Sequence, residues 1–250
     1  MELLKIDNLH KTFKKNKAHA VNGASFSIFK GEVLGLVGES GCGKSTLAKL
    51  ILRLITADKG SIFYKGRDLL KTDHNDMRKM RKNLQIIFQD PYASLDPRMK
   101  IGNVIEEVYD IHKNAHGCDR RNKAIELLET VGLGESYLNR LPSELSGGER
   151  QRVGIARALA TEPEFIICDE PVSSLDISIQ AQILNLLIDI QEKKSLTYLF
   201  ISHDLGVIAS ICDRVIVMRS GVFVETGLCE HVFRNPQHDY TKELLRSVYV

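Results

Sequence analysis

Short apolar runs alternate with helical stripes along much of the chain. Val33–Val37 and Phe165–Cys168 are continuous apolar runs, as expected of strands that are buried on both faces. The first is followed by a stripe with the i, i+3, i+4, i+7 spacing of an amphipathic helix, namely Leu47, Leu50, Ile51 and Leu54. A second helical stripe comprises Ile179, Ile183, Leu186, Leu187 and Ile190. Two more apolar runs, Thr197–Ile201 and Arg214–Met218, flank a short predicted helix over Leu205–Ile211.

The predicted fold class is α/β, with a mostly parallel sheet covered by helices, because strands and helices alternate. Two regions depart from that alternation. Leu3–Leu9 and Ser25–Phe29 are predicted strands of a separate antiparallel layer. The stretch from about Pro91 to Gly154 has no convincing strand and is predicted to be helical. Within it, Gly132 is a candidate C-cap for a stripe formed by Ile125, Leu128 and Val131.

No repeat, low-complexity tract or Gly/Ser linker divides the 250 residues, so we expect one domain over 1–250. Its core is predicted at about 1–88 and 155–250, with a helical insertion at about 89–154. A hydrophobic content of 43% and a charged content of 26% are ordinary for a globular protein and argue against disorder.

Charge, cysteines and apolar stretches narrow the class further. The formal net charge of +2 is too small to favour a nucleic-acid binder. Five scattered cysteines, an odd number, predict reduced thiols rather than a disulfide framework or a zinc site. No apolar run approaches the roughly 20 residues of a membrane span, and no basic leader precedes an apolar stretch at the N-terminus. We therefore expect neither a membrane-spanning segment nor a signal peptide.

A glycine-rich loop predicts a phosphate site between the first apolar run and the first stripe. Residues 38–45, GESGCGKS, match GxxxxGK[ST] and lie between a predicted strand and a predicted helix, the context that confirms this motif. Backbone N–H groups of such a loop and of the helix N-terminus bind phosphates, Lys44 reaches the β- and γ-phosphates, and the Ser45 hydroxyl ligates Mg²⁺. A purely structural turn is the alternative. The predicted nucleotide-binding residues of the loop are Gly38, Glu39, Ser40, Gly41, Cys42, Gly43, Lys44, Ser45 and Thr46.

Two acids end the second apolar run. Asp169 at the strand tip is placed to hold Mg²⁺ through water, and Glu170 beyond it is placed to act as the base that orients an attacking water. Acids at strand ends are common, so this signal is weak alone and strong beside the glycine loop. A GTPase would also need Asn-Lys-x-Asp, and neither Asn16-Lys17 nor Asn122-Lys123 is followed by Asp at that offset.

Residues 145–152, LSGGERQR, resemble the signature motif of ATP-binding cassette (ABC) ATPases. Ser146, Gly147 and Gly148 precede a predicted helix that runs through Val153, Ala156 and Leu159, which gives a second exposed helix N-terminus for phosphate. The resemblance covers nearly the whole chain. It implies a P-loop NTPase, RecA-like core and a dimer of two cassettes. The signature of one cassette caps the ATP held in the glycine loop of the other.

The same resemblance implies roles for further residues. Gln89 corresponds to the glutamine that contacts Mg²⁺ and senses the membrane partner, and His203 to the histidine on the γ-phosphate. Ser173–Asp176 resembles the loop that crosses the dimer interface. Phe13 matches the aromatic residue that stacks on adenine, although core packing is an alternative explanation for a phenylalanine there.

Three stretches are similar to the ATPases of peptide and nickel importers, namely 88–99, 176–187 and 235–241. The implied partners are an identical or related cassette, two transmembrane permease subunits and, indirectly, an extracytoplasmic solute-binding protein. The implied place is peripheral, on the cytoplasmic face of the membrane. Peptide, nickel and metal chelates stay open as solutes. His112 and His116 can bind a metal if both are helical, but a polar loop is the favoured interpretation.

Two alternatives remain at this stage. One is a soluble ABC ATPase that acts on ribosomes or DNA. Such proteins typically carry tandem cassettes or a long coiled-coil insertion, and this chain has a single glycine loop. The other is a regulatory cassette that binds ATP without hydrolysing it, which the presence of Glu170, His203 and Ser146 argues against.

Overall fold

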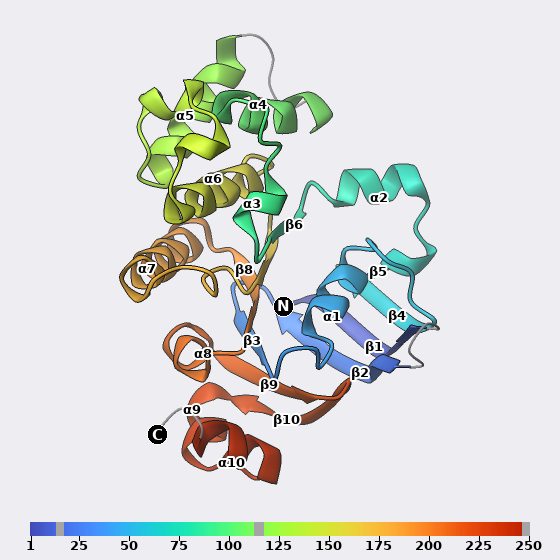
Figure 1. Cartoon of the computed structure of the whole chain (residues 1–250). Helices are drawn as coiled ribbons and strands as arrows, with labels where there is room; N and C mark the ends of the chain where they lie inside the picture. Colours follow the sequence, from blue (N-terminus) through green and yellow to red (C-terminus); the bar gives the residue numbers. More distant parts are fainter. Residues whose placement is uncertain (14–17, 113–117, 247–250) are drawn as a thin grey trace. The chain divides into compact units, whose positions relative to one another are not determined.

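Strands and helices alternate along the chain, as Figure 1 shows for a computed structural model that describes residues 1–13, 18–112 and 118–246. Two compact units contain these elements. The first unit comprises Met1–Met77 and Ser195–Val250, and the second unit comprises Arg78–Lys194. The predicted helical insertion, about 89–154, lies within the second unit. The single-domain organisation stays a prediction.

The first unit begins with an antiparallel sheet in the order β2-β1-β4-β5. Its strands are β1 (Glu2–Phe13), β2 (Ala18–Phe29), β4 (Lys59–Tyr64) and β5 (Arg67–Asp68). This confirms the predicted antiparallel layer and extends both predicted strands. Leu4, Leu9 and Val21 are fully buried, so apolar side chains of β1 and β2 form part of the core.

The first unit also contains the central strands of the α/β fold. β3 (Val33–Val37) runs parallel to both β8 (Thr197–Ser202) and β9 (Arg214–Arg219). β10 (Val222–Leu228) pairs antiparallel with β9. The helices of this part are α1 (Lys44–Ile51), η1 (Leu69–Lys71), α8 (Leu205–Ile211), α9 (Cys229–Arg234) and α10 (Asp239–Arg246), and α2 (His74–Met80) contains the boundary between the units. β3 is buried along its whole length, as its continuous apolar run predicts.

The second unit combines a parallel strand pair with helices. β6 (Leu84–Ile87) pairs with β7 (Phe165–Asp169). The helices are α3 (Pro91–Ser94), α4 (Ile101–His112), α5 (Cys118–Thr130), η2 (Glu135–Asn139), η3 (Pro142–Glu144), α6 (Gly147–Leu159) and α7 (Ile177–Lys194). Gly132 has a φ of +75°, the left-handed C-cap conformation predicted after this stripe. The structure confirms the strand-free stretch between Pro91 and Gly154 for the residues it describes.

The predicted helical stripe after β3 is wrong at its end. α1 stops at Ile51, and Leu54 lies outside the helix with 49% of its surface exposed. Arg53 takes a left-handed conformation with a φ of +50°, which ends the helix. Its Nη1 donates to the carbonyl oxygens of Leu69 at 2.7 Å and Thr72 at 2.6 Å, and these distant contacts stabilise the unfavourable backbone.

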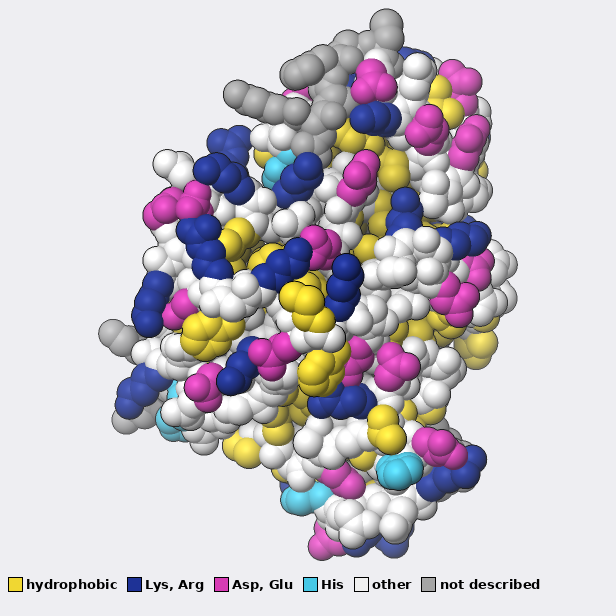
Figure 2. Space-filling model, turned by 180° about the vertical axis from the view of Figure 1, so that it is seen from behind, with side chains coloured by type: hydrophobic (Ala, Val, Ile, Leu, Met, Phe, Trp, Pro, Cys, Tyr) yellow, Lys and Arg dark blue, Asp and Glu magenta, His cyan; other side chains and the backbone are white. Residues whose placement is uncertain are grey.

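Basic and acidic side chains lie interspersed on the face shown in Figure 2. That face therefore carries neither a large basic patch nor a large acidic patch. Among the described residues, no helix combines the length and the low polarity that crossing a lipid bilayer requires.

Candidate nucleotide-binding site

The glycine loop joins β3 to α1 in a conformation that only glycine tolerates at two positions. Gly38 has a φ of +157° and Gly43 a φ of +116°. A Cβ at Gly38 would lie 2.1 Å from the carbonyl oxygen of Met218, and one at Gly43 would lie 2.0 Å from that of Ala20. These approaches fix the shape of the loop against its own unit and leave the N-terminus of α1 directly after it, as an anion site requires.

Lys44 is buried at the start of α1 and turns back into the loop. Its Nζ donates to the carbonyl oxygens of Gly38 at 2.7 Å and Glu39 at 3.0 Å. The ammonium group therefore lies inside the loop that the sequence predicts to hold phosphates. Ser45 and Thr46 follow in the first turn of α1 and are partly exposed. Burial raises the pKa of the Cys42 thiol, which keeps this loop cysteine protonated at neutral pH.

Phe13 ends β1 with 42% of its surface exposed. The core-packing alternative for this ring is therefore wrong, and adenine stacking stays a prediction. The ring borders a hollow of about 550 Å³ whose other lining residues are Lys11, Thr12, Arg53, Leu54, Ile55, Thr56 and Asp58. Lys11 Nζ lies 5.8 Å from the ring centroid.

His203 follows β8 and is exposed. The next residue, Asp204, is the N-cap of α8. The Asp204 carboxylate caps α8 by accepting hydrogen bonds from the backbone N–H groups of Gly206 at 2.8 Å and Val207 at 3.3 Å. This cap fixes the turn that carries His203. The sequence singled out His203 and missed the cap, although Asp one residue before a helix is its usual signature.

In the second unit, a hydrogen bond links Gln89 to Glu170. Asp169 ends β7 and Glu170 follows it; both are buried, and Glu170 has a left-handed φ of +48°. Gln89 Nε2 donates to Glu170 Oε2 at 3.0 Å and lies 3.5 Å from Ser173 Oγ. Three residues that the resemblance assigns to different motifs therefore meet. The strained backbone of Glu170 is the kind of outlier that clusters at functional sites.

The signature segment begins α6 with a reciprocal cap. Ser146 Oγ accepts from Glu149 N at 3.3 Å, and Glu149 Oε2 accepts from Ser146 N at 2.7 Å. Tyr137 Oη donates to Glu149 Oε1 at 2.5 Å, and this bond is the main reason that the pKa of Glu149 is lowered. Gly147 and Gly148 are the first residues of α6 rather than a loop before it. Glu149 and Tyr137 were missed by the sequence analysis, and S-x-x-E was the available signal for Glu149.

The two signature glycines face α7 and the loop before it. A Cβ at Gly148 would lie 2.5 Å from Ile179 Cγ2, and one at Gly147 would lie 3.3 Å from Leu175 Cδ2. The packing inside the second unit therefore excludes side chains at Gly148 unless Ile179 moves. Asp176 caps α7 by accepting from Ile179 N at 3.0 Å, which lowers the pKa of Asp176.

Two arginines of α6 attach α3, the short helix after Gln89. The Arg150 guanidinium carbon lies 3.5 Å from the centroid of the Tyr92 ring. Arg157, two turns further along α6, donates from Nη1 to the carbonyl oxygen of Ser94. The segment that follows Gln89 is thus fixed to the helix that starts with the signature.

The histidine pair proposed as a metal site is only partly described. His112 ends α4, and burial, followed by the charges of Lys82 and Arg78, lowers its pKa. His116 lies outside the described residues, so the favoured non-metal interpretation stays a prediction. Within residues 1–13, 18–112 and 118–246, no group of three or more His, Cys, Asp and Glu side chains forms a metal site.

The predicted residues therefore form two groups. Phe13, the glycine loop and His203 belong to the first unit, where the loop contacts β2, β9 and α10. Gln89, Glu170 and the signature residues belong to the second unit with Asp169. Gln89 and Glu170, the two predicted catalytic residues of that unit, are hydrogen-bonded to each other.

Comparisons with known proteins identify the family. A sequence model described as ABC transporter matches residues 21–173. The chain is 49% identical to the oligopeptide transport ATP-binding protein OppF of Streptococcus mutans, over 99% of this chain and 82% of that protein. It is 47% identical to the dipeptide transport ATP-binding protein DppF of Haemophilus influenzae, over 94% of this chain and 72% of that protein.

A solved structure agrees in fold. The dimeric post-hydrolysis state of the ATP-binding cassette MJ0796, bound to ADP and Pi, is 29% identical with a TM-score of 0.82, covering 91% of this chain and 99% of that one. The predicted α/β fold, a P-loop NTPase core with an added antiparallel layer, is confirmed. The chain belongs to the ABC transporter family, as one of its ATP-hydrolysing cassettes.

Proposed function

We propose that this cassette supplies ATP-driven closure to a peptide importer. The observation that carries the hydrolytic part is the hydrogen bond that fixes Glu170 to Gln89 beside the buried Asp169. The peptide part rests on the relatives, which are named for oligopeptide and dipeptide transport rather than for nickel.

The glycine loop is proposed to bind the triphosphate, with the Lys44 ammonium directed to the β- and γ-phosphates. Phe13 supplies a ring for adenine stacking. For Mg²⁺ the donor set fits: the Ser45 hydroxyl, the Gln89 amide oxygen and the Asp169 carboxylate are the hard oxygen ligands that this ion takes. Because Gln89 donates through Nε2, its carbonyl oxygen is the atom left for a cation. The ion, when bound, neutralises charge on the phosphates.

Glu170 is proposed to orient and polarise the attacking water, and His203 to hold the γ-phosphate. The Gln89 amide holds the Glu170 carboxylate by donating to Oε2 at 3.0 Å, and a carboxylate held in place in this way can accept a proton from water. Catalysis then comes mainly from positioning and charge stabilisation.

Two cassettes are proposed to meet so that the Ser146 helix tip of one closes on the nucleotide of the other. The cassette MJ0796, bound to ADP and Pi, is dimeric, which supports a dimer of two cassettes. Ile177, the first residue of α7 directly after the predicted interface loop, is 85% exposed and offers an apolar side chain to such a partner. Proposed partners are an identical or related cassette, two permease subunits and an extracytoplasmic solute-binding protein, and the proposed place is the cytoplasmic face of the membrane.

Purification from membranes tests the proposed partners. A tagged full chain expressed with its native membrane proteins should copurify with two permease subunits, and its ATPase rate should rise when peptide-loaded binding protein is added. A nickel-loaded binding protein in place of the peptide serves as the matched comparison. Copurification with ribosomes, or stimulation by nickel alone, would contradict the proposal.

The signature glycine gives a packing test inside one unit. Gly148→Ala should reduce the ATPase rate roughly tenfold. The new methyl group would clash with Ile179 of α7 and push the start of α6 away from it. Adding Ile179→Ala should restore part of the rate by making room. Gly154→Ala in the same helix, where an added Cβ meets nothing within 4 Å, is the control and should stay near the wild-type rate. Full activity of Gly148→Ala would refute this packing argument.

A further inference from the structure

The tyrosine of α10 contacts the outside of the glycine loop. Glu39 N, in the loop, donates to the phenolic oxygen of Tyr240 at 3.2 Å, across 201 positions of sequence. The tyrosine is almost fully buried, with 2% of its surface exposed. The Arg219 guanidinium carbon lies 4.6 Å from its ring centroid. The buried ring therefore lies against Arg219 while its oxygen faces the loop backbone.

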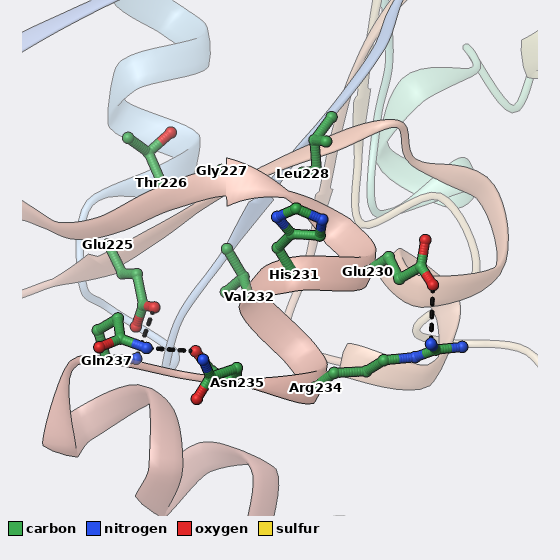
Figure 3. A pocket seen from close by; sticks show the side chains of 10 residues that line it. All are labelled: Glu225, Thr226, Gly227, Leu228, Glu230, His231, Val232, Arg234, Asn235 and Gln237. Atoms are coloured by element: carbon green, nitrogen blue, oxygen red, sulfur yellow. Dashed lines mark hydrogen bonds and ion pairs between the residues drawn. The ribbon is translucent and has the colours of Figure 1, made fainter.

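Hydrogen bonds also fix the residues just before α10. Glu225 of β10 accepts from the backbone N–H of Gln237 at 2.8 Å and from that of His238 at 3.1 Å, and Figure 3 shows the Glu225 carboxylate directed at Gln237. The Tyr240 backbone N–H donates to His238 Nδ1 at 3.1 Å, which caps the first turn of α10. These contacts set the position from which Tyr240 reaches the loop. The hollow of about 590 Å³ in the same figure is open and lined mostly by exposed side chains.

Two further contacts join the chain around β9 and β10 to the glycine loop. Gly221 N donates to the Cys42 carbonyl oxygen at 2.8 Å. The Met218 carbonyl oxygen lies against Gly38, where no Cβ fits. Residues 218–240 therefore contact the loop at its beginning, at Glu39 and at Cys42.

We propose that Tyr240 is a positioning residue for nucleotide binding, which holds the glycine loop in its phosphate-binding shape from behind. The inference rests on the proposed phosphate role of residues 38–46. A loop with three glycines at positive φ has many alternative conformations, and each conformation removed beforehand lowers the entropy lost on binding. The Tyr240 hydroxyl removes some of that freedom by fixing the Glu39 amide.

The Tyr240→Phe variant removes one oxygen and keeps the ring. In the full chain, the Kd for ADP measured by titration calorimetry should rise about 2- to 10-fold, the range expected for one hydrogen bond. The KM for ATP should rise in parallel while kcat changes less than twofold. Amide hydrogen exchange of the peptide that contains Glu39 should become faster without nucleotide. Tyr64→Phe in β4 makes the same chemical change at a buried site away from the loop and should leave the Kd unchanged.

An unchanged ADP Kd, or unchanged exchange at Glu39, overturns the inference even if the melting temperature falls, since a merely structural tyrosine would affect the melting temperature alone. If Tyr64→Phe weakens ADP as much as Tyr240→Phe does, the effect is general loosening and the inference also fails. The Lys44→Ala variant tests the proposed phosphate site separately from the role of Tyr240. If it binds ADP as well as the wild type, the phosphate site fails and the inference fails with it.

Discussion

Replacing Glu170 with glutamine should slow ATP hydrolysis at least a hundredfold while ATP binding is kept. The amide cannot accept a proton from water, so the proposed base is lost. The exchange is nearly isosteric, and Gln89 Nε2 can donate to the new amide oxygen as it does to Oε2 at 3.0 Å. The left-handed turn at position 170 and its burial should therefore survive. Steady-state ATPase rates and equilibrium ATP binding measure the two effects separately.

Glu192→Gln is the matched control for this variant. Glu192 lies on the exposed side of α7, so the same change in charge and size there should leave turnover unchanged. Trapping of an ATP-bound dimer in the Glu170→Gln variant, seen by size-exclusion chromatography, is the companion result. Undiminished turnover of Glu170→Gln would remove this residue from the proposed role.

Lys44→Ala should weaken ATP binding at least tenfold and abolish hydrolysis at ordinary ATP concentrations. The variant loses the charge-assisted bonds to phosphate, each worth about 1.5–3 kcal/mol. It also loses the two bonds that Nζ donates to the Gly38 and Glu39 carbonyl oxygens, so the loop itself relaxes. Calorimetry with ATP and with ADP measures the loss directly.

The control for this variant is Lys49→Ala, which removes a lysine from the exposed side of the same helix. It should bind ATP with an affinity within about twofold of the wild type, because surface charges contribute little. Equal ATP affinity of Lys44→Ala and the wild type would contradict the phosphate site as a whole.

The sequence predicts the central elements well because their signals are local. β3 and β7 are continuous apolar runs, and the glycine motif between β3 and α1 is defined by adjacent residues. β4 was missed although Ile62 and Tyr64 alternate with less buried neighbours, a period-two pattern that was present and not used. β10, α9 and α10 were missed as well.

Other features depend on contacts between distant residues. The end of α1 is set by Arg53 bonding to carbonyl groups around position 70, which no pattern inside the stripe reveals. Ile179 against Gly148 and Tyr240 against Glu39 are likewise tertiary contacts. The motif similarity predicts the residues of the site, whereas only the coordinates identify the side chains that hold them.

The two carbonyl bonds of Lys44 change how the strength of nucleotide binding should be understood. In the proposed site, a phosphate oxygen that takes the place of the Gly38 or Glu39 oxygen replaces one acceptor of the ammonium group with another. Binding is then an exchange of acceptors, and the net gain is smaller than a count of contacts in the complex would imply. A modest net gain in binding free energy suits an ATPase that must release ADP in every cycle. On release, the Lys44 ammonium can bond again to the carbonyl oxygens of Gly38 and Glu39.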